Sequence, residues 1–231
     1  FIQSTWLAGL TLVADRYDKT VWPPLRADNR YTLRGKDAAG VSAHYAWQTS
    51  RRINAAGEMT TDRRGHFATL HTARLTIGTG LDASLQVRHL SPRYVAPHAK
   101  AGIRNSRVQN ETGLTALVNW RTAPRFSTMA YADFFRFPRP TYKASLPGSK
   151  GMELFLQESY TPSQTAILTL RYKMLTRQED IKGHKGTLQY ATTHRLRMAY
   201  TTNVLPGYTL HAAVDATFAC TQTTSPRQGF M

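Results

Sequence analysis

The side chains best suited to acid–base or metal chemistry in this chain are its histidines and carboxylates, and their spacing favours neither. His211 and Asp215 would share one face of a β-strand, but four residues of strand separate them by about 13 Å. That distance is too long for a base and the acid that orients it. The other histidines lack metal-ligand spacing such as His-x-x-x-His on a helix. The sequence therefore predicts no catalytic residue and no metal site. A membrane-embedded hydrolase remains a minor alternative, and its signature would be titratable groups within hydrogen-bond reach on adjacent strands.

Glycine-containing segments could bind phosphates, but none of them completes a known motif. Gly78-Thr79-Gly80 lacks the third glycine and the helix of a dinucleotide-binding motif, and Gly35-Lys36-Asp37 lacks the hydroxyl residue and the upstream glycine of a P-loop. Gly148-Ser149-Lys150-Gly151 indicates a loop tip, not a nucleophile elbow. The sequence predicts turns or loops at all three and no bound cofactor.

Positive charge is the strongest compositional feature. The chain has 30 Lys and Arg against 14 Asp and Glu, a formal net charge of +16, which favours anionic partners. Residues 90–107 contain no Asp or Glu, and their basic residues are Arg93, Lys100, Arg104 and Arg107. We expect them to meet lipopolysaccharide phosphates at the outer leaflet of a Gram-negative envelope. A charge that merely keeps the loops soluble is also compatible with this composition.

Nucleic acid is the alternative partner. The segments Arg136–Lys143 and Leu170–Lys173 interleave basic and aromatic residues, as single-strand-binding surfaces do. A soluble or peripheral β-rich module that binds nucleic acid through a basic surface is therefore the second hypothesis. Lipid phosphates are favoured over nucleic acid as the partner because both segments fall at expected strand ends. Basic and aromatic groups at strand ends suit a membrane interface.

Alternation of apolar and polar residues predicts the elements that must carry these side chains. In Tyr208–Cys220, the apolar set that begins at Leu210 and ends at Cys220 recurs at every second residue, and the preceding segment His194–Thr202 follows the same rule. The other expected strands are centred on residues 5–17, 41–47, 52–60, 67–77, 82–90, 114–120, 125–137, 151–160 and 166–174. Together they make about eleven antiparallel strands.

The connections between these strands alternate in length. Short turns are expected at 48–51, 78–82, 121–124, 161–164 and 203–207, and longer links at 18–39, 61–67, 90–110, 137–151 and 176–193. Strands of ten to thirteen residues, tilted by about 45°, would span about 23–30 Å, the thickness of a bilayer's apolar layer. Short turns at one end and long loops at the other are typical of outer-membrane barrels. The sequence predicts an all-β, antiparallel, up-and-down transmembrane β-barrel.

Aromatic residues are expected to form two girdles at the membrane interfaces. Trp47, Trp120 and Tyr160 lie next to short turns, whereas Tyr17, Phe134, Phe135 and Phe137 lie next to long connections. A soluble barrel whose core is capped by aromatics is the alternative explanation.

One domain is expected to occupy residues 1–231, because no linker, repeat or low-complexity segment divides the chain. Eleven strands is an odd number, and Gln228–Met231 predicts the start of a twelfth, so we expect part of a larger barrel that is truncated at one or both ends. An incomplete barrel would bind other envelope proteins through its open edges. Cys220 is the only cysteine, so no intrachain disulfide can form.

Three segments carry a family resemblance: Arg107–Gly113, Tyr131–Pro138 and His194–Arg197. They resemble the C-terminal barrel region of a Bacteroidetes-type family that carries ComEA-like helix-hairpin-helix repeats ahead of its barrel. The resemblance spans about residues 30–220. It implies an outer-membrane location and no activity, because the family looks functionally uncharacterised. The chain itself contains no helix-hairpin-helix segment, so a DNA-binding role of those repeats does not extend to it. We expect a channel, a transport component or an envelope scaffold, not an enzyme.

Overall fold

The computed structural model describes residues 5–49, 52–100, 102–205 and 207–223, and these residues form strands, turns and loops without a helix. No helix in this part of the chain therefore meets the length and hydropathy needed to cross a membrane. The eleven strands are β1 (Thr5–Val21), β2 (Gly35–Gln48), β3 (Ile53–Asp62), β4 (Phe67–Ile77), β5 (Leu81–Leu90), β6 (Glu111–Ala123), β7 (Phe126–Phe137), β8 (Ser149–Ser163), β9 (Ala166–Ile181), β10 (His184–Leu205) and β11 (Tyr208–Thr223).

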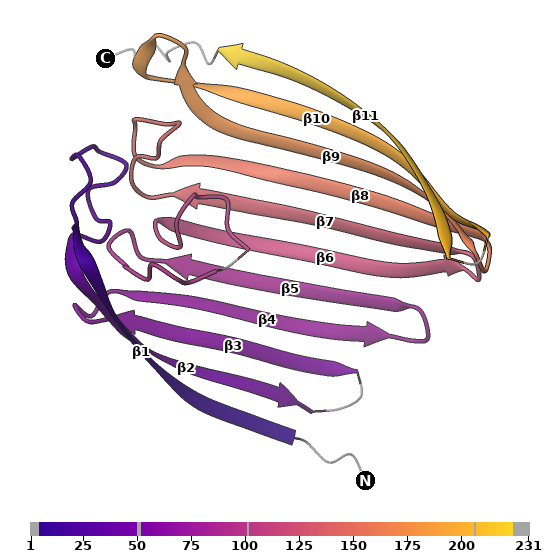
Figure 1. Ribbon diagram of the computed structural model, residues 1–231, viewed down its shortest axis with the longest axis horizontal. Coiled ribbons are helices and arrows are strands. Elements are labelled where there is room, and N and C mark those ends of the chain that lie inside the picture. The colour runs from indigo at the N-terminus through magenta and orange to yellow at the C-terminus, as the bar shows by residue number, and fades with distance from the viewer. Residues whose placement is uncertain (1–4, 50–51, 101, 206, 224–231) are drawn as a thin grey trace, which may run out of the picture.

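The strands form one sheet in chain order. Each strand pairs with the next in antiparallel orientation, from β1 in indigo to β11 in yellow (Figure 1). The predicted antiparallel, up-and-down, all-β fold is therefore confirmed. Among the described residues no pairing joins β11 back to β1, so closure into a barrel stays a prediction. The twelfth strand expected at Gln228 lies outside the described residues.

The register gives the sheet two chemically different faces, because directly paired residues point to the same side. Leu114 pairs with Val87 of β5 and with Phe134 of β7, and Val118 pairs with Ala83 and Ala130. The same parity continues to both ends of the sheet, where Leu10 pairs with Ala43 and Met198 pairs with Val214. We call this side the apolar face and the opposite side the polar face.

The apolar face is uncovered. Leu12 has 82% of its surface exposed, Leu10 77% and Phe218 66%. Only eight apolar residues of the described chain are buried, and three of them, Ala68, Leu90 and Tyr94, form a small cluster on the polar face. The largest fully buried side chains include Arg88, Glu111, Asp133 and Glu153. The distribution of burial is the reverse of that in a water-soluble domain, where charged residues are rarely buried and large apolar ones usually are.

Three of the five predicted long connections are present, and the other two are short instead. Long loops follow β1, β5 and β7 at residues 22–34, 91–110 and 138–148, whereas residues 63–66 form a four-residue turn. The long link expected at 176–193 is wrong: β9 and β10 continue as a paired hairpin, with Thr176 opposite Thr192 and Leu188 opposite Asp180. This part of the hairpin is polar on both faces, so alternation could not reveal it. Backbone pairing extends the strands, together with a hydrogen bond between the hydroxyls of Thr176 and Thr192.

Candidate functional site on the polar face

A buried group of ionised side chains lies at the centre of the polar face. Arg88 of β5 donates from Nε to Glu111 Oε1 at 2.7 Å and from Nη1 to Asp133 Oδ1 at 2.7 Å. Its Nη2 also donates to Asp133 Oδ2 at 3.1 Å, and Thr115 donates its hydroxyl to Asp133 Oδ1 at 2.7 Å. All three charged side chains are at most 1% exposed. Glu111 and Asp133 thus hold the Arg88 guanidinium on two sides.

The loop between β5 and β6 adds a second arginine to this group. Arg104 donates from Nε to Asp133 Oδ2 at 2.7 Å, and its Nη2 lies 3.0 Å from Glu153 Oε1. Lys173 of β9 reaches the other oxygen of Glu153 at 2.9 Å. The group therefore contains three cations and three carboxylates, and it joins five consecutive strands, β5 to β9, to the loop.

Glycine at position 113 makes room for this arrangement. Gly113 pairs directly with Arg88 on the polar face, and a Cβ built at Gly113 would overlap the Arg88 guanidinium. Any larger residue there would push the guanidinium off its carboxylates. A buried ion pair contributes little net stability when complete, but losing one partner costs about 3–5 kcal/mol because a bare charge is left behind. The network consequently specifies how these strands and the loop fit together.

Arg104 remains charged in this site. Burial alone would lower the pKa of its guanidinium, but the hydrogen bond to Asp133 and the charge of Glu153 outweigh burial and raise that pKa. The backbone amides of Arg104 and Asn105 both donate to Glu111 Oε2, at 2.8 and 2.9 Å. The loop is therefore fixed to the polar face by charge and by backbone hydrogen bonds.

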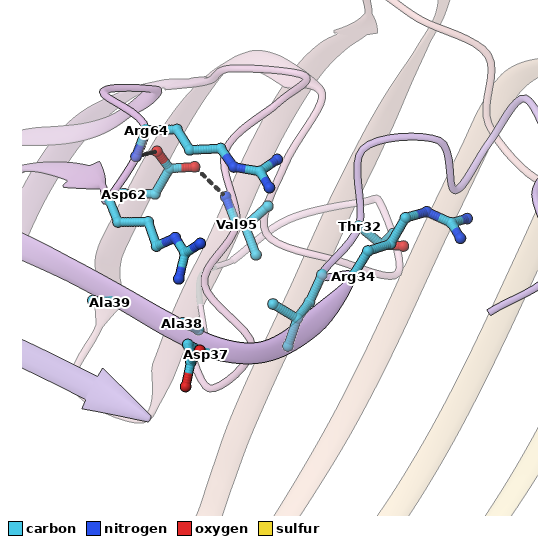
Figure 2. A pocket seen from close by; sticks show the side chains of 10 residues that line it. Thr32, Arg34, Asp37, Ala38, Ala39, Asp62, Arg64 and Val95 are labelled. Atoms are coloured by element: carbon cyan, nitrogen blue, oxygen red, sulfur yellow. Dashed lines mark hydrogen bonds between the residues drawn. The ribbon is translucent and has the colours of Figure 1, made fainter. Parts of the chain in front are cut away.

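The first half of the same loop is held by a different carboxylate. Asp62, at the end of β3, accepts hydrogen bonds from the backbone amides of Arg64, His66 and Val95, the last at 3.2 Å. Figure 2 shows Asp62 between Arg64 and Val95, beside a small pocket that also includes Arg34 and Asp37. These contacts anchor the loop to the rim of the sheet.

Tyr94 packs beneath this part of the loop. It contacts the cluster of Ala68 and Leu90, and its hydroxyl lies 3.1 Å from Thr60 Oγ1. Burial raises the pKa of the Tyr94 hydroxyl, although the hydrogen bond to Thr60 opposes the shift. The loop 91–110 therefore packs on the polar face at one end of β3–β6.

A cavity of about 760 Å³ separates this loop from the β1–β2 loop. Its lining is mixed, with Tyr17, Leu33 and Ile103 alongside the basic residues Lys100 and Arg107. Tyr17 also bonds to His98 of the loop at 3.2 Å. The cavity opens between loops and contains no pair of reactive groups.

The structure brings the short-turn aromatics together on the apolar face. Trp47 stacks on Trp6 with ring centroids 5.2 Å apart, and Tyr160 stacks on Phe126 at 4.5 Å. Trp120, 52% exposed, has the same parity on β6. These residues lie on the apolar face next to short turns, and a girdle at a membrane interface stays a prediction.

The aromatics next to the long connections divide between the faces. Phe134 is exposed on the apolar face, but Phe135 and Phe137 are buried and have the parity of the polar face. Tyr17 faces His98 of the β5–β6 loop. Of this second group, Phe134 alone has the position of a lipid-facing residue.

The four basic residues of the β5–β6 loop also differ in position. Arg93 lies over the Tyr31 ring at 5.3 Å, and Lys100 and Arg107 are exposed. Arg104 is committed to Asp133 and Glu153. Three of the four are thus available to an external anion, and the fourth is structural. The sequence missed Arg88, Glu111, Asp133 and Glu153, although ionisable residues at polar-face positions of successive strands were a signal that could have revealed them.

The chemical capacity of the site is electrostatic. The described residues contain no group of His, Cys, Asp or Glu arranged to hold a metal ion. His211 and Asp215 have separate partners, Thr201 at 2.8 Å and Arg197 at 3.8 Å. Tyr131 and Glu153 are titratable groups hydrogen-bonded on adjacent strands, the signature set for a hydrolase. However, Glu153 also pairs with Arg104 and Lys173, and no histidine or cysteine belongs to the group.

The arrangement can hold a loop in place and present charge along one face of a sheet. Compared with known protein families and with curated proteins, the chain matches none.

Proposed function

We propose that this chain is the greater part of an outer-membrane β-barrel of a Gram-negative bacterium that acts as a channel or transport component, with its polar face turned inward. The proposal rests on which side chains are exposed and which are buried. One face of the sheet exposes large apolar side chains, and the buried centre of the other face consists of ionised ones. Transmembrane barrels have this arrangement, because lipid contacts one face of every strand and water or polar side chains contact the other. The resemblance to the ComEA-like family belongs to the same proposal.

Strand length supports it. β7 has 12 residues and β6 has 13, which at about 3.3 Å per residue and a 45° tilt span about 28–30 Å. Stacked aromatics at the short-turn end suit the membrane interface, and Arg93, Lys100 and Arg107 in the long loop suit lipid phosphates outside it.

The experiment compares cell fractions and gel mobility. The full-length protein should be recovered with outer membranes, and unboiled samples should migrate differently from boiled ones in SDS. Purified protein should then conduct ions in planar bilayers. Outer-membrane recovery without conductance would leave an envelope scaffold as the function. Recovery in the soluble fraction, with nucleic-acid affinity that falls steeply with salt, would establish the alternative of a basic nucleic-acid-binding module.

A further inference from the structure

Four cations form a block on the polar face of the C-terminal half of the sheet. Arg171 and Lys173 lie two residues apart on β9, and Arg195 and Arg197 lie two residues apart on β10. The register places Arg171 directly opposite Arg197 and Lys173 directly opposite Arg195. We name these four residues the cation block.

Like charges in directly opposed positions of a sheet repel each other and destabilise it. The block contains two such pairs side by side, with opposed Cβ atoms about 5 Å apart and successive same-face residues about 7 Å apart. Nothing in strand pairing requires this. The directly opposed residues of β8, Phe155 and Gln157, are uncharged, and β11 places Thr217 opposite Arg195 and a single carboxylate, Asp215, opposite Arg197.

The surrounding carboxylates neutralise the block only in part. Lys173 pairs with Glu153, which Arg104 shares, and Arg197 lies 3.8 Å from the exposed Asp215. Arg171 donates from Nε and Nη2 to Gln157 Oε1, a neutral acceptor, at 3.0 and 2.8 Å. Arg195 is exposed and makes no ion pair with any residue that the structure describes.

The rest of the polar face has no comparable excess of positive charge. On the polar face of β1–β3 the charged residues are Asp15, Glu58 and Asp62, with Lys36 at the start of β2. Without Lys173, the central network has two cations, Arg88 and Arg104, against three carboxylates. A mobile anion on this face would therefore be drawn toward β9 and β10 and away from β1–β3.

We infer that the cation block is a binding site for a multiply charged oxyanion, a phosphorylated or polycarboxylated solute. Three guanidinium groups and one ammonium within this area suit an anion with several oxygens, because arginine binds phosphate and carboxylate through paired hydrogen bonds. The anion is a solute and not a lipid headgroup, since the block lies on the face opposite the exposed apolar surface. The inference rests on the proposed function and makes this site the anion-selective part of the conducting path.

The test measures binding and conduction separately on the full-length protein. Calorimetry in detergent follows inorganic pyrophosphate binding to the native protein, to Arg195→Gln/Arg197→Gln, and to a control, Lys36→Gln/Arg107→Gln. The control removes the same charge from exposed loop and strand-end positions. We expect affinity to fall about tenfold or more in the first variant, as loss of charge-assisted bonds predicts, and less than about twofold in the control. Equal losses in both variants, or no binding by the native protein, would overturn the site.

A second measurement, the reversal potential of the channel in a salt gradient, reports its preference for anions or cations. The native channel should prefer anions, and Arg195→Gln/Arg197→Gln should shift the reversal potential toward cation preference while the control does not. Conductance with an unchanged preference in the block variant would refute its role in selectivity and leave the channel intact. Pyrophosphate binding that depends on the block in a protein without conductance would refute the channel and keep the site.

Discussion

Asp133 is the residue on which most of the polar-face network depends. Its two oxygens accept hydrogen bonds from Arg88, Arg104 and Thr115, and the side chain is 1% exposed. Its one carboxylate links β7 to β5, to β6 and to the β5–β6 loop. No other carboxylate of the group binds the side chains of both Arg88 and Arg104.

Asp133→Asn should destabilise the protein by about 3 kcal/mol, because it removes the negative charge that Arg88 and Arg104 share, and Arg88 stays fully buried. The loss is measured as a lower temperature at which unboiled, detergent-solubilised protein changes to its unfolded gel mobility. The matched control is Asp215→Asn, whose carboxylate is 62% exposed and 3.8 Å from Arg197. It should change stability by less than about 1 kcal/mol. Equal effects of the two substitutions would contradict a structural role for the network.

Tyr94 provides a pH-dependent prediction. Its pKa is raised above the ordinary value near 10, chiefly by burial, so the folded state favours the neutral phenol. The associated stability is fully present below pH about 10 and is lost as pH rises through the higher pKa of the folded protein. Alkaline titration of phenolate absorbance should show one tyrosine fewer at the high-pH end in Tyr94→Phe. That variant should also lose less stability above pH 10. If the titration step that Tyr94→Phe removes lies at the ordinary tyrosine pKa, burial of Tyr94 is contradicted.

The aromatic residues that the sequence singled out divide between the two faces of the sheet. Trp47, Trp120 and Tyr160 lie on the apolar face as a lipid-facing girdle requires, because their parity follows the alternation of their strands. Phe135 and Phe137 were grouped with Phe134 by nearness to a loop, yet adjacent residues of a strand point to opposite faces. The ion network needed the register between strands, which one sequence does not contain.

Among the strands, β11 offers the sharpest contrast between the two faces. Val214 and Ala213 are adjacent, both are exposed, and they lie on the apolar and polar faces respectively. In water the two positions would tolerate a charge equally well. In a bilayer only the polar-face position would.

Val214→Arg should therefore reduce the stability of the folded protein in lipid by about 2–4 kcal/mol, whereas Ala213→Arg should have little effect. The measurement is the fraction of protein that folds into vesicles across a urea titration, read from the gel-mobility shift. Asp215, two residues from Ala213 on the same face, adds a favourable neighbour for the control arginine. Similar tolerance of both substitutions would argue that the apolar face does not contact lipid.

At the scale of strands, sequence reasoning succeeded where one face is apolar and the other polar. All eleven strands were expected near their observed positions, five from clear alternation and the other six from less regular segments between turns. It failed at residues 176–193, where β9 and β10 pair through polar residues on both faces, including Thr176 opposite Thr192. Hydrogen bonding between backbones forms that part of the hairpin, and backbone pairing leaves no trace in side-chain type.

For the whole molecule, the number of strands constrains closure. In an up-and-down sheet every odd-numbered strand runs the same way, so β1 and β11 are parallel to each other. Direct pairing between them would introduce one parallel contact into an otherwise antiparallel barrel. Bacterial single-chain barrels have even numbers of antiparallel strands. Closure therefore calls for a further strand, antiparallel to both edges, between β11 and β1.

Thiol cross-linking can test this strand order in the full-length protein, because Cys220 lies on β11 and is exposed. A cysteine at Thr192, directly opposite Cys220 on β10, should cross-link to it with a short bifunctional reagent, since opposed Cβ atoms lie about 5 Å apart. Single cysteines at Leu10, Leu12 or Ala14 of β1 should not, because an intervening strand would separate them from β11 by about twice the 4.8 Å strand spacing. Efficient cross-linking from β1 would show that the two edges meet directly. It would make the barrel eleven-stranded, with β1 and β11 as its one parallel pair.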